Sequence, residues 1–268
     1  RQRQMCIRDR FRGVLNGNKH TIKGLKTAFI QVLEKGRISD LTFAGAEVTG
    51  NGDTGVLANV IGTGKQDPIH LGNISVTGKV TGTGNTGAVA GLAKGSNITI
   101  TGISNSANIS GGTNAGGLIG LIQATDDQQS EANITITLSY NIGEVAGAQA
   151  GGLVGAVEIA NLTTARNVEI ANCYNAGVLT KGANMVGKVS AGNGRTILNK
   201  CIGIQLYYSD AAGMIGTAAL VSGSTQTSAC NVSNCYYYSM NPVYAFTDAN
   251  FTTGTATALD DVQIKTQA

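Results

Sequence analysis

The 268-residue chain has no tryptophan, two prolines and two histidines, and charged residues make up only 13% of it. No apolar run approaches the about 18 residues that a membrane-spanning helix needs, so we expect no direct membrane insertion. There is no HExxH motif, and a histidine-based zinc site needs ligands closer in sequence than His20 and His70. We therefore expect neither a metal nor another cofactor, and both histidines should lie on the surface.

The chain also has little excess charge of either sign. It contains 19 Lys and Arg against 16 Asp and Glu, but residues 1–10 alone hold four arginines and one aspartate. Beyond residue 10 the basic and acidic residues balance. That balance gives no reason to expect nucleic acid or an anionic membrane surface as a partner.

Residues 1–10, RQRQMCIRDR, resemble the translation of a transposon-type sequencing adaptor. We expect this segment to be an artefact and the protein's own sequence to begin near Phe11. The alternative is a genuine basic N-terminal arm. If the adaptor interpretation is right, the absence of a signal peptide or an anchor from the sequence says nothing about export.

Glycine, by contrast, is abundant. The chain has 38 glycines and an apolar fraction of 42%, and valine, isoleucine and threonine dominate between the glycines. Such a chain is too apolar to be disordered. Its composition predicts β-strands joined by many tight turns.

A four-residue block, glycine followed by two apolar residues and a small residue, recurs along the chain. The first residues of successive blocks are 32, 30, 35, 32 and 29 residues apart, and a degenerate copy begins 27 residues before the first. A period of about 30 residues is typical of solenoid proteins. The blocks begin at Gly55, Gly87, Gly117, Gly152, Asn184 and Gly213, and the degenerate copy begins at Ala28.

Two further strand-like segments follow each block, one with the period-two alternation of a strand and one short apolar segment beside a glycine. Three strands per repeat predict an all-β fold, a right-handed parallel β-helix of about seven rungs over residues 11–240, with rungs about 4.8 Å apart. The alternating pairs are Ile74 and Val76, Ile98 and Ile100, Ile134 and Ile136, and Val168 and Ile170, and the short segments are centred on Val48, Val80, Ile109, Val145 and Val178.

Equal phases in the repeats predict columns of like side chains along the coil. One column should hold small residues, so its cysteines are expected to pack as a stack, although a Cys230–Cys235 disulfide is an alternative. Asparagines precede this column in three repeats, where they should turn corners in the left-handed backbone conformation. The longest insertion, from Gln123 to Glu131, should form a surface loop. The small-residue column is Ser106, Ser139, Cys173, Cys201 and Cys235, and the asparagines are Asn105, Asn172 and Asn234.

Three stretches carry a resemblance to a known family. Residues 11–25, FRGVLNGNKHTIKGL, resemble the first rung of GLUG-repeat proteins, the GGLVG sequence of residues 151–155 resembles the repeat signature, and residues 172–178, NCYNAGV, resemble the strand and turn that follow it. Each block is short, but six or seven in phase, from Phe11 to about Tyr238, are specific. The family occurs in bacterial adhesin-like surface proteins and in the non-catalytic N-terminal part of some immunoglobulin A peptidases. The resemblance implies an extracellular scaffold or recognition module, and it transfers no catalytic residue.

Motifs that suggest catalysis have simpler explanations. Two GxGxxG strings begin at Gly50 and Gly82, but neither opens a helix in a βαβ unit, so we interpret both as corner turns. A polysaccharide-cleaving β-helix enzyme would need clustered carboxylates. The acids here are scattered, and the neighbours Asp126 and Asp127 fall in the insertion.

Aromatic residues collect late in the chain. Exposed tyrosines can stack on sugars or anchor a protein partner, so these are the candidate ligand-binding residues for a glycan or an extracellular protein. The alternative is that they cover the last rung, with residues 241–268 forming a C-terminal cap and the start of a following segment. The candidates are Tyr207, Tyr208, Tyr236, Tyr237 and Tyr238.

The sequence therefore favours a non-catalytic cell-surface or secreted bacterial scaffold, or adhesin module, that binds host or matrix ligands. One alternative is an accessory region of a secreted peptidase. The other is a polysaccharide-active β-helix enzyme.

Overall fold

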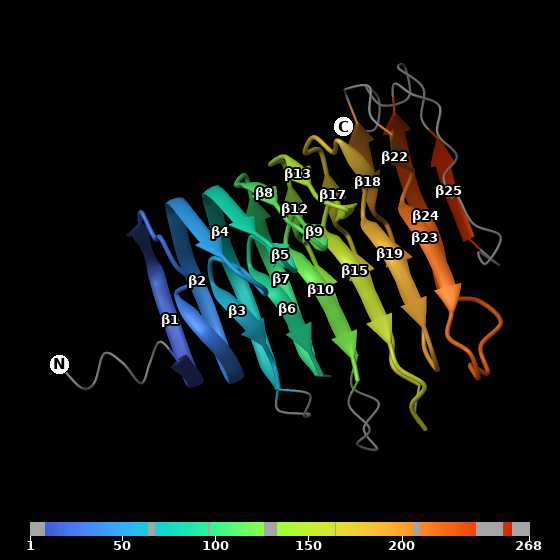
Figure 1. The fold of residues 1–268 in the computed structure, drawn as a ribbon, viewed down its shortest axis with the longest axis horizontal. Helices are drawn as coiled ribbons and strands as arrows, with labels where there is room; N and C mark the ends of the chain where they lie inside the picture. The colour runs from blue at the N-terminus through green and yellow to red at the C-terminus, as the bar shows by residue number, and fades with distance from the viewer. Residues whose placement is uncertain are drawn as a thin grey trace.

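Figure 1 shows a computed structural model of the chain, in which strands lie side by side from β1 (Arg10–Lys23) to β25 (Gly254–Ala258). The structure describes residues 9–63, 68–95, 97–125, 133–163, 165–205, 210–239 and 254–258. Strand pairings in these ranges are parallel. The chain is a parallel β-solenoid, which confirms the fold that the repeat predicted.

The first rungs consist of long strands that run around more than one side of the coil. β1 pairs with β2 (Ile30–Gly50), and β2 pairs with β4 (Ile69–Gly82) over most of their lengths. β1 starts at Arg10, one residue before the start expected for the protein's own sequence.

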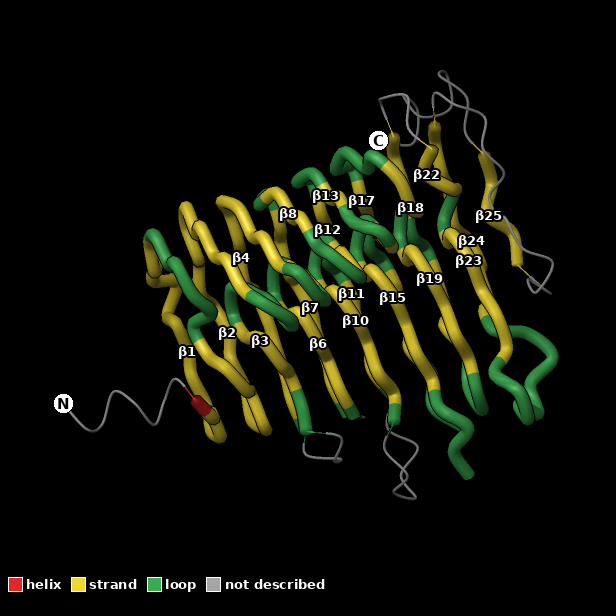
Figure 2. Tube along the Cα trace, viewed as in Figure 1, coloured by secondary structure: helices red, strands yellow, loops and turns green. Residues whose placement is uncertain are grey.

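Later rungs are divided into shorter strands, with loops at the corners (Figure 2). The block wall, which contains the recurring block, is formed by β3 (Ala58–Ile61), β6 (Ala90–Lys94), β10 (Ile119–Ala124), β15 (Val154–Ile159), β19 (Val186–Ala191) and β23 (Ile215–Leu220). The alternating wall is formed by β7 (Ile98–Asn105), β11 (Ile134–Thr137), β16 (Val168–Ala171), β20 (Thr196–Asn199) and β24 (Cys230–Ser239).

The remaining strands close each rung. The third wall contains β12 (Tyr140–Asn141), β17 (Tyr174–Asn175) and β21 (Ile202–Gln205). In the earlier rungs, β8 (Asn108–Ser110) and β13 (Val145–Ala146) come after the segment that lies in this wall. A separate small sheet contains β5 (Thr86–Gly87), β9 (Asn114–Gly116), β14 (Gln149–Gly151), β18 (Lys181–Ala183) and β22 (Asp210–Ala212).

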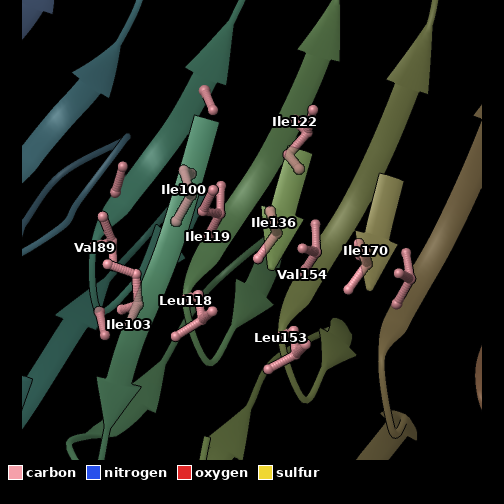
Figure 3. Close-up of a cluster of buried hydrophobic side chains, with 14 of the residues drawn as sticks. Val89, Ile100, Ile103, Leu118, Ile119, Ile122, Ile136, Leu153, Val154 and Ile170 are labelled. Atoms are coloured by element: carbon pink, nitrogen blue, oxygen red, sulfur yellow. The ribbon is translucent and has the colours of Figure 1, made fainter. Parts of the chain in front are cut away.

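The core lies between the block wall and the alternating wall. Each block contributes two consecutive inward residues, such as the buried Leu118 and Ile119. The alternating wall contributes every second residue, such as the buried Ile134 and Ile136. Figure 3 shows Leu118, Ile119 and Ile136 among the buried side chains of successive rungs. Burial of these columns is the main stabilising term, because a single rung has no partner for its apolar side chains.

The pairing corrects the predicted phase of the block. Ala90 pairs with Ile119, and Gly87 pairs with Gly116, so the block that matches Gly117 begins at Ala88 and not at Gly87. The copy at Gly55 is displaced by one residue in the same way. The blocks at Gly117 and Gly152 each follow another glycine, and the sequence pattern alone aligned Gly87 with the wrong glycine of the pair.

Two other predicted columns are also corrected. Ile98 pairs with Ile69, whereas Ile74 lies beyond a corner and pairs with Ile103. In the last segment, Val145 bridges to the buried Leu179 and not to Val178. Both errors arose because alternation continues around corners, so that apolar residues on adjacent walls look equivalent in sequence.

One corner of each rung from β2 to β24 uses the left-handed backbone conformation. Residues at this corner have φ between 51° and 64°. Asn172 and Asn234 confirm the predicted corner role, whereas Asn105 lies three residues beyond the corner, which Gly102 occupies in its rung. The corner residues are Asp40, Asn73, Gly102, Leu138, Asn172, Lys200 and Asn234.

The small sheet packs against a column of glycines in the block wall. A Cβ atom on Gly120 would lie 2.3 Å from the backbone nitrogen of Thr86, and one on Gly155 would lie 2.7 Å from that of Ala115. Only glycine leaves space for this approach. The column is Gly91, Gly120, Gly155, Gly187 and Gly216.

Asparagines form a buried ladder inside the third wall. Nδ2 of Asn105 donates to Oδ1 of Asn141 at 2.7 Å, and Nδ2 of Asn141 donates to Oδ1 of Asn175 at 2.8 Å. Each side chain also bonds the backbone two residues ahead; Asn141, for example, accepts from the N–H of Gly143. The sequence pattern did not reveal this ladder because it placed Asn105 in the corner column.

The first two rungs are joined by a carboxylate that is buried by its neighbours. Glu34 forms ion pairs with Arg10 and Arg12, and its side chain is 3% exposed. The Arg12 guanidinium, which donates a hydrogen bond, and the Arg10 charge hold the pKa of Glu34 below its ordinary value of 4.5.

This ion pair predicts acid sensitivity of the first rungs. Because the folded-state pKa is lowered, the ion pair stabilises the fold fully above the ordinary glutamate pKa, and the stabilisation is lost as the pH falls through the folded-state value. We expect Glu34→Gln to be less stable than the wild type at pH 7 and the difference to vanish in acid. Urea midpoints between pH 7 and pH 3 measure this. A constant difference at every pH would contradict the assignment.

Candidate ligand-binding surface

The structure separates the candidate tyrosines. Tyr207 and Tyr208 lie outside the described residues. Tyr236, Tyr237 and Tyr238 are half-buried in β24, between β21 and β25. Tyr237 packs against the core, whereas its neighbours in this alternating strand project from the opposite face. Tyr236 and Tyr238 therefore remain candidates for ligand contact, and Tyr237 serves the core.

Tyr236 belongs to an outward column that the sequence pattern did not identify. Tyr140 pairs with Tyr174, Tyr174 with Ile202, and Ile202 with Tyr236. We call these four residues the tyrosine ladder. In the rungs that precede it the same column holds Ser104 and Ser75, so the outer side of this wall changes from small and polar to large and apolar.

The first two rings of the ladder stack on each other. The ring centroids of Tyr140 and Tyr174 are 4.7 Å apart, with an angle of 5° between the ring planes. This separation equals the spacing of the rungs, so the rings follow the solenoid axis. Burial raises the pKa of the Tyr174 hydroxyl, and the neighbouring Tyr140 raises it further. A tyrosine hydroxyl can donate a hydrogen bond to a ligand.

Exposed aliphatic residues flank the stack. Leu138 is 65% exposed, and Ile142 is 50% exposed, on either side of Tyr140 in the same rung. Leu138 also occupies the left-handed corner, with φ of 51°, a conformation that is costly for a branched side chain. An exposed apolar residue in a strained backbone conformation is more typical of a binding site than of a scaffold corner. We refer to the ladder together with Leu138 and Ile142 as the tyrosine face.

One signal in the sequence could have identified this face. Tyr140 and Tyr174 both follow a small residue of the predicted column, Ser139 or Cys173, by one position. That spacing gives them one phase and the outward orientation. The late cluster of aromatics pointed to the C-terminal residues instead.

Acidic residues do not gather at the tyrosine face. In the register of the described strands no two carboxylates are paired; Glu169, for example, pairs with Thr135 and Ile197. Asp126 and Asp127 lie outside the described residues. Across the part of the chain that the structure describes, no group of three or more His, Cys, Asp and Glu side chains is arranged to hold a metal ion. His20 and His70 are exposed, as expected. Within the same ranges, no helix has the length and hydropathy to cross a bilayer.

The described cysteines are buried free thiols, so no disulfide joins Cys230 to Cys235 in this structure. Both lie in β24, but Cys230 faces the core from the alternating wall, while Cys235 follows the corner at Asn234. Burial raises the pKa of Cys230 to about 12 and that of Cys173 to about 11. The small-residue stack is confirmed from Ser139 to Cys235, but Ile103 takes the place predicted for Ser106.

No family model, curated protein or solved structure matches the chain.

Proposed function

We propose that the chain is a non-catalytic, cell-surface or secreted bacterial module of GLUG type, which binds an extracellular ligand through the tyrosine face. The observation that carries this proposal is the row of stacked, partly exposed tyrosines flanked by Leu138 and Ile142. Tyrosine supplies a large apolar area and a hydroxyl at a low entropic cost, which is why it dominates binding surfaces. GLUG membership rests on the repeat and on the signature at residues 151–155.

Several features of the face favour recognition of a neutral ligand. At the described corners of the ladder's own rungs, Lys200 is the one charged residue, and the ladder itself carries no charge. Each of the two stacked rings covers one face of the other, and the ring edges and hydroxyl groups are available to a ligand. A surface of ring edges, hydroxyls and aliphatic groups suits a neutral glycan or an uncharged protein surface of the matrix.

The proposal predicts that Tyr174→Ser weakens binding. The purified full chain is applied to a panel of glycans and matrix proteins, and the affinity for each bound ligand is compared with that of the variant. We expect at least a tenfold loss, because Tyr174 is central in the ladder and central tyrosines contribute about 2 kcal/mol or more to binding. The matched control is Ile197→Ser, which removes an outward apolar residue from the alternating wall.

Unchanged affinity in Tyr174→Ser, with the control also unchanged, would place the site elsewhere. Binding to nothing in the panel would contradict the adhesin function. Release of products from a polysaccharide in the panel would instead support the enzyme alternative.

A further inference from the structure

Three cysteines occupy consecutive rungs in the inward column after the corner. Tyr174 pairs with Ile202, and Ile202 pairs with Tyr236. The residues that precede these three are Cys173, Cys201 and Cys235, which are all buried free thiols. Cys201 therefore has a cysteine neighbour on each side along the solenoid axis.

The contact between Cys201 and Cys235 is the closer of the two. The backbone N–H of Cys201 donates to Sγ of Cys235 at 3.4 Å. In-register neighbours lie about 4.8 Å apart at Cα, inside the about 4.4–6.8 Å range of disulfides. Their Cβ atoms must approach by about 0.3 Å to reach the upper limit of about 4.5 Å.

The local structure permits this adjustment at Cys235 and resists it at Cys173. The pairing of β24 with β25 is irregular between Val232 and Cys235, so β24 is not held in strict register on that side. β17, which follows Cys173, is paired regularly on both sides. The thiol hydrogen bonds do not distinguish the two positions, because Sγ of Cys173 donates to the carbonyl of Ala171 and Sγ of Cys235 donates to that of Ser233, both at 3.2 Å. Cys230 has the hydroxyl-bearing Thr196 as its neighbour in register and no cysteine there.

We propose that Cys201 and Cys235 form a disulfide between adjacent rungs when the protein folds in an oxidising compartment. Whether the protein meets an oxidising compartment depends on the proposed export. The capacity of the two thiols to form the bond does not depend on it. The bond would link two adjacent rungs and close a covalent loop between Cys201 and Cys235. That loop would restrict the conformations of the unfolded chain.

The chemistry is thiol–disulfide exchange with a disulfide oxidant, such as an oxidoreductase or oxidised glutathione. Cys235 is the nucleophile, because the neighbouring thiol of Cys201 and the backbone N–H of Cys201, which donates to Sγ of Cys235, hold the pKa of Cys235 below its ordinary value. The Cys235 thiolate attacks the oxidant and forms a mixed disulfide, releasing one thiol. Cys201 then loses its proton and displaces the second thiol. Two protons and two electrons leave the protein, and the oxidant's disulfide becomes two thiols.

The test is refolding of the full chain in reduced and oxidised glutathione. All forms carry Cys6→Ser, which removes the fifth cysteine. Free thiols are then alkylated, and the denatured protein is cleaved with chymotrypsin, which separates Cys201 from Cys235 at Tyr207 or Tyr208. We expect mass spectrometry to find Cys201 linked to Cys235, with Cys173 and Cys230 alkylated.

Two variants complete the test. Cys173→Ser should keep the link, and its oxidised form should melt about 5 °C above its reduced form, whereas Cys201→Ser should lose both the link and the difference. Alkylation of both Cys201 and Cys235 after refolding, or a Cys173–Cys201 link, would overturn the proposal. Ligand binding by the reduced chain tests the proposed function separately.

Discussion

Replacement of Gly151 by alanine should destabilise the solenoid strongly, although it adds only one methyl group. Gly151 ends β14 in the small sheet, where the chain turns back into the block wall. A Cβ atom there would lie 1.9 Å from the carbonyl oxygen of Val154 and 2.6 Å from the backbone nitrogen of Gly187. Both contacts are with backbone atoms, which cannot move aside as a flexible side chain could.

We expect Gly151→Ala to cost about 3 kcal/mol of unfolding free energy, at the upper end for overpacking, measured by urea denaturation followed by circular dichroism. Gly72→Ala is the matched control. A Cβ atom on Gly72 would meet only side-chain carbons, the nearest at 3.8 Å, and its backbone is not in the left-handed region. That variant should be neutral or stabilised by up to about 1 kcal/mol. Equal effects of the two alanines would show that the turn into the block wall is looser than the close backbone contacts of Gly151 indicate.

Replacement of Asn141 by leucine should have the second large effect. Asn141 is buried at the centre of the ladder, between Asn105 and Asn175, and its amide also bonds both backbone groups of Gly143. Leucine has a similar volume but satisfies none of these groups. The buried donors and acceptors left behind each cost about 1–3 kcal/mol, so we expect a total loss of about 4 kcal/mol.

Asn108→Leu is the control for the asparagine ladder. Asn108 is exposed, and its Oδ1 accepts only the N–H of Glu144, at 3.2 Å. We expect Asn108→Leu to change the urea midpoint little, because water can accept the hydrogen bond of the Glu144 backbone N–H that loses its partner. A small effect of Asn141→Leu, comparable with that of the control, would mean that packing and not amide bonding fixes the register of the third wall.

The sequence predicted the fold class well because rung length and strand alternation are local properties. A period near 30 residues with alternating apolar residues allows few architectures other than a parallel solenoid. The individual columns were harder to predict. Ile74 and Ile98 carry the same local pattern, yet a left-handed corner at Asn73 places them on different walls.

The candidate surface was predicted only in part, for a related reason. Tyr236 was identified because it lies among other aromatics, whereas Tyr140 and Tyr174 are isolated in sequence and meet only through the register. Cys235, by contrast, was predicted to share a column with Cys201, and the structure confirms this neighbour one rung away. Contacts between rungs depend on register to the residue, and loops of varying length obscure that register in the sequence.

The central claim is that tyrosines from separate repeats form one binding surface. A double-mutant cycle of ligand affinity between Tyr140→Ser and Tyr174→Ser tests it most directly, with the ligand bound most tightly in the panel and with melting temperatures measured as a check on folding. If the stacked rings act as one site, the losses will not add, and the coupling will exceed about 0.5 kcal/mol. Additive losses, or no loss from either change, would contradict the claim.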